Sequence, residues 1–111
     1  MEALRAALPS DWQLGLEPEP VFGGRMLVLR AGAAAAPPLL LVHGLGQNGF
    51  TDWLPVLPDL ARRWRVLAVD LPAFGYSSPS AERLSPTRYA HVLARLLARE
   101  GLGPVPVVGH S

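Results

Sequence analysis

The stretch that decides the fold is residues 39–46, which read Leu-Leu-Leu-Val-His-Gly-Leu-Gly. Four consecutive aliphatic residues followed by glycines are typical of a strand that is buried on both faces of a parallel sheet. A parallel strand is normally followed by a helix, and residues 53–64 carry apolar side chains at helical spacing, with Asp52 as a possible cap. Pro55 and Pro58 confine regular helix to the later part of that segment. The sequence therefore predicts an α/β protein with a mostly parallel sheet and flanking helices.

The pattern of strand and helix continues toward the C-terminus. Residues 66–69 (VLAV) and 105–108 (VPVV) are short apolar runs that predict two further strands. Between them, residues 87–100 have an apolar stripe at helical spacing. Ser85 and Pro86 suit the cap and the first position of that helix. Two successive crossovers of this kind should be right-handed.

Upstream, residues 25–30 (RMLVLR) form an apolar run between glycines, which predicts another strand. Val21 and Phe22 are its expected hairpin partner. Residues 33–38 (AAAAPP) are expected to form a loop, since consecutive prolines do not join a sheet ladder. We expect residues 1–111 to make up a single α/β core.

Composition excludes several kinds of chemistry. The chain has 111 residues, half of them hydrophobic, and ten basic against nine acidic residues. This near-neutral balance offers no basic surface for nucleic acid. All ten cations are Arg and there is no Cys, which excludes a Schiff-base lysine, a thiolate nucleophile and a zinc-thiolate site within these residues. We expect neither a metal nor a cofactor.

Two features bear on where the protein resides. The N-terminal residues contain no apolar run of signal-peptide length, so a cytoplasmic location is expected. The longest apolar stretch, residues 31–42, is interrupted by Gly32 and two prolines and is shorter than the roughly 20 helical residues that cross a bilayer. No membrane span is predicted.

Motifs with small residues follow the first and last of the predicted parallel strands. Gly109, His110 and Ser111 come directly after residues 105–108, where a tight strand-to-helix turn can expose a serine at the carboxyl edge of the sheet. His43, Gly44, Leu45 and Gly46 follow the first buried strand. Such an H-G-x-G loop can supply a backbone N–H, here that of Leu45, to an oxyanion hole. His43 is expected to shape the loop rather than to act as a base.

A third motif, residues 70–77 (DLPAFGYS), follows the second strand, and the order HGLG, DLPAFGYS, GHS resembles the α/β-hydrolase fold superfamily over residues 22–111. This resemblance implies a nucleophilic Ser111 that forms an acyl-enzyme with a small ester, thioester or lactone. It also implies that Asp70 and Gly75 are structural. The family commonly has glycine where this chain has Ala73, a departure that concerns loop shape.

In this family the catalytic acid and histidine follow the nucleophile along the chain. The resemblance therefore implies that residues 1–111 are the N-terminal half of an α/β-hydrolase fold, ending at the nucleophile elbow and inactive alone, with the C-terminal half missing.

Two alternatives stay open at this point. Gly44, Gly46 and Gly49 form a G-x-G-x-x-G pattern after a strand, with Asp70 at the end of the next strand, as in a dinucleotide-binding oxidoreductase domain. The other alternative is a truncated, non-catalytic product.

Overall fold

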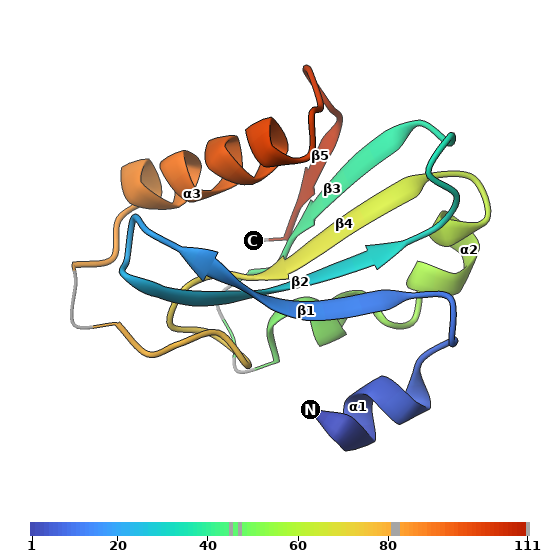
Figure 1. Cartoon of the computed structure of the whole chain (residues 1–111), viewed down its shortest axis with the longest axis horizontal. Coiled ribbons are helices and arrows are strands. Elements are labelled where there is room, and N and C mark those ends of the chain that lie inside the picture. The colour runs from blue at the N-terminus through green and yellow to red at the C-terminus, as the bar shows by residue number, and fades with distance from the viewer. Residues whose placement is uncertain (45, 47, 81–82, 111) are drawn as a thin grey trace.

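The structure is a computed structural model that describes residues 1–44, 46, 48–80 and 83–110. Its strands form one sheet in the order β1-β2-β4-β3-β5 (Figure 1). Their bounds, in chain order, are β1 Gln13–Glu19, β2 Gly24–Ala31, β3 Pro38–Val42, β4 Arg65–Asp70 and β5 Val107–Gly109. Strand β2 pairs antiparallel with β1 and β4, whereas β3 pairs parallel with β4 and β5. All strands except β2 therefore run in one direction, which confirms the mostly parallel sheet.

Helices cover both faces of the sheet, as Figure 1 shows. The short elements α1 (Glu2–Ala7), η1 (Gly49–Trp53) and α2 (Leu57–Ala61) supply side chains to the hydrophobic cluster on one face. Helix α3 (Pro86–Arg99) packs on the other face, where its Val92 and Leu96 are buried. Because side chains alternate along each strand, the central strands contribute to both clusters. This arrangement is a three-layer α/β architecture.

The start and end of α3 follow the predicted signals. The side chain of Ser85 accepts a hydrogen bond from the amide of Arg88, 3.1 Å away, and Pro86 is the first helical residue. Gly101, just past the end, has a φ of +69°, a conformation that glycine adopts without steric cost. The predicted cap and first position of this helix are confirmed, and the helix ends at Arg99, one residue before the predicted Glu100.

Other predicted elements were wrong in detail. Val21 and Phe22 lie in the turn of the hairpin, and the partner of β2 is β1. The turn is held by Glu19, whose carboxylate accepts hydrogen bonds from the amides of both Val21 and Phe22. Within residues 53–64, regular helix is confined to α2, as the positions of Pro55 and Pro58 predict, but the N-cap of α2 is Val56 rather than Asp52. Prolines in this segment explain the shortening, because each removes an amide donor from a helix.

An ion-pair network ties the hairpin to the end of α3. The guanidinium of Arg30 on β2 pairs with both Glu17 on β1 and Glu100 after α3. Arg65 at the start of β4 binds the second oxygen of Glu100 at 3.1 Å. The hydrogen bond from Arg30 lowers the pKa of Glu100 below its usual value, although its burial opposes this. The network links the end of α3 to β1, β2 and β4.

Within the described residues, no helix is both long and apolar enough to cross a membrane.

Candidate active site

The three motifs meet at one edge of the sheet. Strands β4, β3 and β5 are adjacent and parallel, so the residues that follow them emerge side by side at their carboxyl ends. The amide of His110 donates to the carbonyl of Val42, 3.1 Å away, which ties the two loops together. A Cβ on Gly44 would lie 2.4 Å from the carbonyl oxygen of His110. Glycine is required at position 44 because the two backbones approach so closely.

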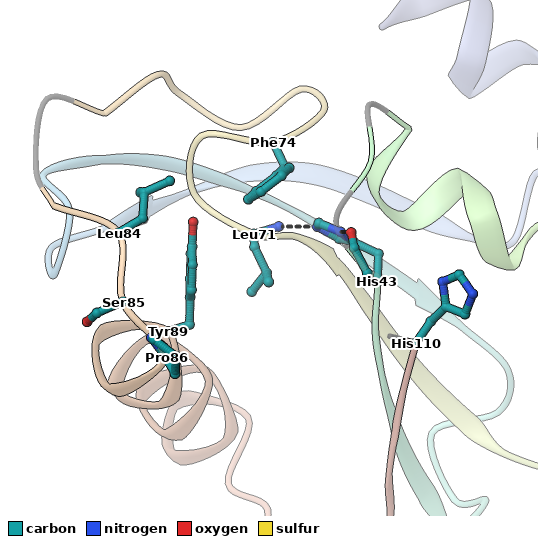
Figure 2. A pocket seen from close by; sticks show the side chains of 9 residues that line it. His43, Leu71, Phe74, Leu84, Ser85, Pro86, Tyr89 and His110 are labelled. Carbon is teal, nitrogen blue, oxygen red and sulfur yellow. Dashed lines mark hydrogen bonds between the residues drawn. The ribbon is translucent and has the colours of Figure 1, made fainter.

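The imidazole of His43 links its own loop to the segment after β4. Its Nε2 accepts a hydrogen bond from the amide of Leu71 at 2.9 Å (Figure 2), and its Nδ1 lies 2.7 Å from the carbonyl oxygen of Gly44. Since an amide N–H can only donate, Nε2 carries no proton and Nδ1 donates to Gly44. Both ring nitrogens are thus engaged, and His43 is 4% exposed. This arrangement leaves the ring no free nitrogen with which to accept a proton from a nucleophile.

Asp70 binds both loops at the sheet edge through its carboxylate. One oxygen accepts from the amide of Phe50 at 2.7 Å and the other from the amide of Tyr76 at 2.8 Å. The backbone carbonyl of Asp70 accepts from the hydroxyl of Ser77 at 2.5 Å, and the same hydroxyl accepts from the amide of Leu27. Burial raises the pKa of Asp70, and the two amide donors act in the opposite direction.

Two glycines leave room for the Asp70 carboxylate between the two loops that it binds. A Cβ on Gly49 would lie 2.0 Å from one carboxylate oxygen of Asp70, and a Cβ on Gly75 would lie 2.2 Å from the other. Both glycines also have positive φ, +59° and +52°. Any side chain at either position would displace the carboxylate, so the loop conformations and Asp70 depend on one another.

Ala73 is the one described non-glycine residue with positive φ, at +76°. Its amide donates to the carbonyl of Ser78 at 3.0 Å, which holds the turn in this conformation. We expect Ala73→Gly to raise the free energy of unfolding by roughly 0.5–1 kcal/mol, because relief of the Cβ clash exceeds the extra chain entropy of glycine.

Urea denaturation followed by circular dichroism measures this change. Ala90→Gly, at an exposed position inside α3, is the matched control and should lower stability by about 1 kcal/mol. A loss of stability in both variants would contradict the strain assigned to Ala73.

The other predicted site residues are placed as follows. Leu45 and Ser111 lie outside the described residues. Gly46 and Gly109 have open space where a Cβ would stand, and Gly109 is the last residue of β5. The ring of His110 packs edge-on against Trp53, with the ring centroids 6.3 Å apart.

A cavity of about 510 Å³ opens beside this edge, between the loop after β4 and the start of α3. Figure 2 shows Phe74, Leu84 and Tyr89 around one end of it, with His43 and His110 toward the other. Gly44, Leu71, Ser85 and Pro86 complete its lining. No local sequence signal marks Phe74, Leu84 or Tyr89 as neighbours, because only the packing of α3 against the loop brings them together.

A family model described as the alpha/beta hydrolase fold matches residues 37–111, and the chain belongs to this family. It is 38% identical over 85 residues to the magnesium-chelatase 30 kDa subunit of Rhodobacter capsulatus, which covers 76% of this chain and 30% of that protein. It is 34% identical over 82 residues to 2-hydroxy-6-oxo-6-(2'-aminophenyl)hexa-2,4-dienoic acid hydrolase of Metapseudomonas resinovorans, with 71% and 28% covered.

Among solved structures, naproxen esterase from Bacillus subtilis superposes with a TM-score of 0.83 at 26% identity, over 99% of this chain and 38% of that one. The chain thus spans about a third of the length of the proteins it resembles. Its relatives include hydrolases.

The dinucleotide-binding alternative is wrong. The chain matches the alpha/beta hydrolase family instead. In a dinucleotide-binding domain Asp70 would have to offer its carboxylate to a ribose, but here this residue is fully buried and both of its carboxylate oxygens are bound to backbone amides. Gly49 faces that carboxylate, and η1 stands where the pyrophosphate-binding helix would begin.

Proposed function

We propose that the chain carries the nucleophile and half of the oxyanion hole of a serine hydrolase that cleaves a small carboxylic ester, thioester or lactone. In this proposal Ser111 attacks the carbonyl carbon and the backbone N–H of Leu45 binds the oxygen that becomes negatively charged. The alcohol or thiol leaves, and water then hydrolyses the acyl-enzyme. No cofactor or metal is required, and we propose a small uncharged substrate and a cytoplasmic location.

One observation carries the proposal. The loops that contain Leu45 and Ser111 start from adjacent parallel strands, and the hydrogen bond from His110 to Val42 holds the two strand ends together. A nucleophile and an oxyanion donor must both lie near a single carbonyl group. The adjacency of the two strand ends supports the proposal.

The general base is proposed to lie outside residues 1–111. The chain has three histidines. Both nitrogens of His43 are bound, His91 is an exposed residue of α3, and His110 is directed against Trp53. We therefore assign the role of general base to none of these three histidines. We propose that residues 1–111 are the N-terminal part of a longer hydrolase, which supplies the histidine and its acidic partner.

Labelling of the full-length protein with a fluorophosphonate tests the function directly. Such reagents phosphonylate an activated serine, and tandem mass spectrometry locates the adduct. The expected result is a single adduct on Ser111, formed in parallel with the loss of p-nitrophenyl acetate hydrolysis. An adduct elsewhere, or esterase activity that survives complete labelling of Ser111, would overturn the proposal.

Removing the proposed oxyanion donor gives a second prediction. We expect Leu45→Pro to lower kcat for p-nitrophenyl acetate by on the order of a hundredfold or more, because proline has no amide hydrogen. Leu45→Met, which keeps the amide, should stay within a few-fold of the wild type. Steady-state kinetics measure both, and equal losses in the two variants would contradict a role for the Leu45 backbone.

A further inference from the structure

A second cavity lies at the amino ends of the parallel strands, at the edge of the sheet opposite to the three motifs. Strand β2 ends at this edge and β4 begins there, since Ala31 pairs with Val66 (Figure 1). The cavity has a volume of about 500 Å³, a size that suits a small molecule. The residues that line this amino-edge cavity are Pro9, Asp11, Trp12, Gly32, Ala33, Pro58, Ala61 and Arg62, all of which the structure describes.

The walls of the amino-edge cavity are held in place by local contacts. In the turn before β1, the amide of Trp12 donates to the carbonyl of Pro9 at 3.1 Å. The loop after β2 lies tightly against the chain that follows α2, because a Cβ on Gly32 would stand 2.0 Å from the carbonyl oxygen of Trp64. The φ of Gly32 is +95°, which also favours glycine. A ligand in a site held in this way has little chain to order when it binds.

The lining of the amino-edge cavity contains one acid and one base, Asp11 and Arg62. Both residues are exposed. Within the described parts of the chain, neither side chain forms an ion pair or a hydrogen bond, so the two do not bind each other. By contrast, Arg30 and Arg65 at the same edge are both bound to Glu100. A ligand in the cavity therefore has access to one group of each charge.

The rest of the lining is mainly apolar. Trp12 packs partly against the hydrophobic cluster beneath α2, which holds its ring in position. Pro58 and Ala61 are three residues apart on α2 and share one face of that helix. A tryptophan ring and a proline ring bind apolar groups with little loss of conformational entropy, because both are rigid. The cavity thus combines two opposite charges with an apolar surface.

We propose that the amino-edge cavity binds a small zwitterion in which an apolar spacer separates an ammonium group from a carboxylate. Asp11 accepts hydrogen bonds from the ammonium group, Arg62 donates to the carboxylate, and the spacer lies against Trp12. A spacer is needed because the two side chains are too far apart to pair directly. An ω-amino acid and a dipeptide share this chemistry. The proposal is independent of Ser111, and the ligand would bind even to a protein that hydrolyses no ester.

Calorimetric titration of the full-length protein with 6-aminohexanoate tests the proposal. We expect Asp11→Asn and Arg62→Gln each to weaken binding by about threefold to fivefold, the upper range for an exposed ion pair. Asp59→Asn and Arg63→Gln are the matched controls, because Asp59 and Arg63 are exposed residues of the same region that do not line this cavity. Both controls should bind the probe as the wild type does.

Two probes that each lack one charge assign the contacts. Hexanoate has no ammonium group, so Asp11→Asn should leave its binding unchanged while Arg62→Gln weakens it. Hexylamine has no carboxylate and should show the reverse pattern. A variant that merely disturbs the cavity wall would weaken the binding of all three probes equally, and that result would overturn the assignment.

A comparison with alanylalanine distinguishes the two sources of such a zwitterion. Tighter binding of alanylalanine than of 6-aminohexanoate supports a dipeptide as the ligand, and the opposite order supports an ω-amino acid. Absence of saturable binding of both probes at millimolar concentration would overturn the proposal. Binding of hexanoate as tightly as 6-aminohexanoate by the wild type would also overturn it, since Asp11 would then contribute nothing.

Discussion

Ser111→Ala is expected to lower kcat for p-nitrophenyl acetate by on the order of ten-thousandfold or more, with no change in thermal stability. The substitution removes only the hydroxyl oxygen that is proposed to attack the carbonyl carbon. The alternative nucleophile is a water molecule bound in the remaining site, which accounts for any residual rate. Because the acyl-enzyme can no longer form, the initial burst of p-nitrophenol should disappear as well.

A matched serine variant controls for this result. Ser10 is exposed and far along the chain from the strand ends, so Ser10→Ala should leave kcat unchanged. Turnover by Ser111→Ala at the wild-type rate would exclude the serine hydrolase assignment. Loss of turnover together with a lowered melting temperature would instead show that the substitution damages the fold.

Asp70→Ala is expected to lower the free energy of unfolding by about 3–5 kcal/mol, because it leaves the amides of Phe50 and Tyr76 without an acceptor. This loss is a large share of the roughly 5–15 kcal/mol that stabilises a typical domain. The loops that start at His43 and Leu71 are both tied to this carboxylate, so esterase activity should fall as well.

Asp70→Asn gives an intermediate result that identifies the mechanism. The amide side chain keeps one acceptor oxygen and places an NH₂ group against the other backbone donor, so we expect a loss of about 1–3 kcal/mol. Asp52→Ala is the control, because Asp52 is exposed and its replacement should change stability by no more than about 0.5 kcal/mol. Urea denaturation measures the free energy of unfolding of all three variants. Equal stability of Asp70→Ala and Asp52→Ala would refute the proposal that the Asp70 carboxylate holds the two loops.

Much of the fold follows from sequence patterns that depend only on local physics. The aliphatic runs of β3 and β4 are buried on both faces, and the combination of Ser85, Pro86 and Gly101 sets the limits of α3. These signals are strong because burial and capping act on residues adjacent in the chain. Strand β1 was missed because Gly15 and Pro18 interrupt its alternating pattern.

The site was predictable to the extent that strand ends define it. The positions of His43 and Asp70 at one sheet edge follow from parallel strand topology. The hydrogen bond from Leu71 to His43, and the two amides bound by Asp70, depend on loop conformations that no local pattern specifies. The cavity wall formed by Phe74, Leu84 and Tyr89 depends on how α3 docks, which is a property of the whole sheet.

The order of the strands has a consequence for synthesis on the ribosome. The hairpin of β1 and β2 joins neighbours in the chain and can form as soon as it emerges. Strand β3 has no partner until β4 has been translated, and its other edge stays open until β5 follows. The nascent chain therefore carries an unpaired, strongly apolar strand through the translation of residues 43–64, and during this interval the strand is exposed to aggregation.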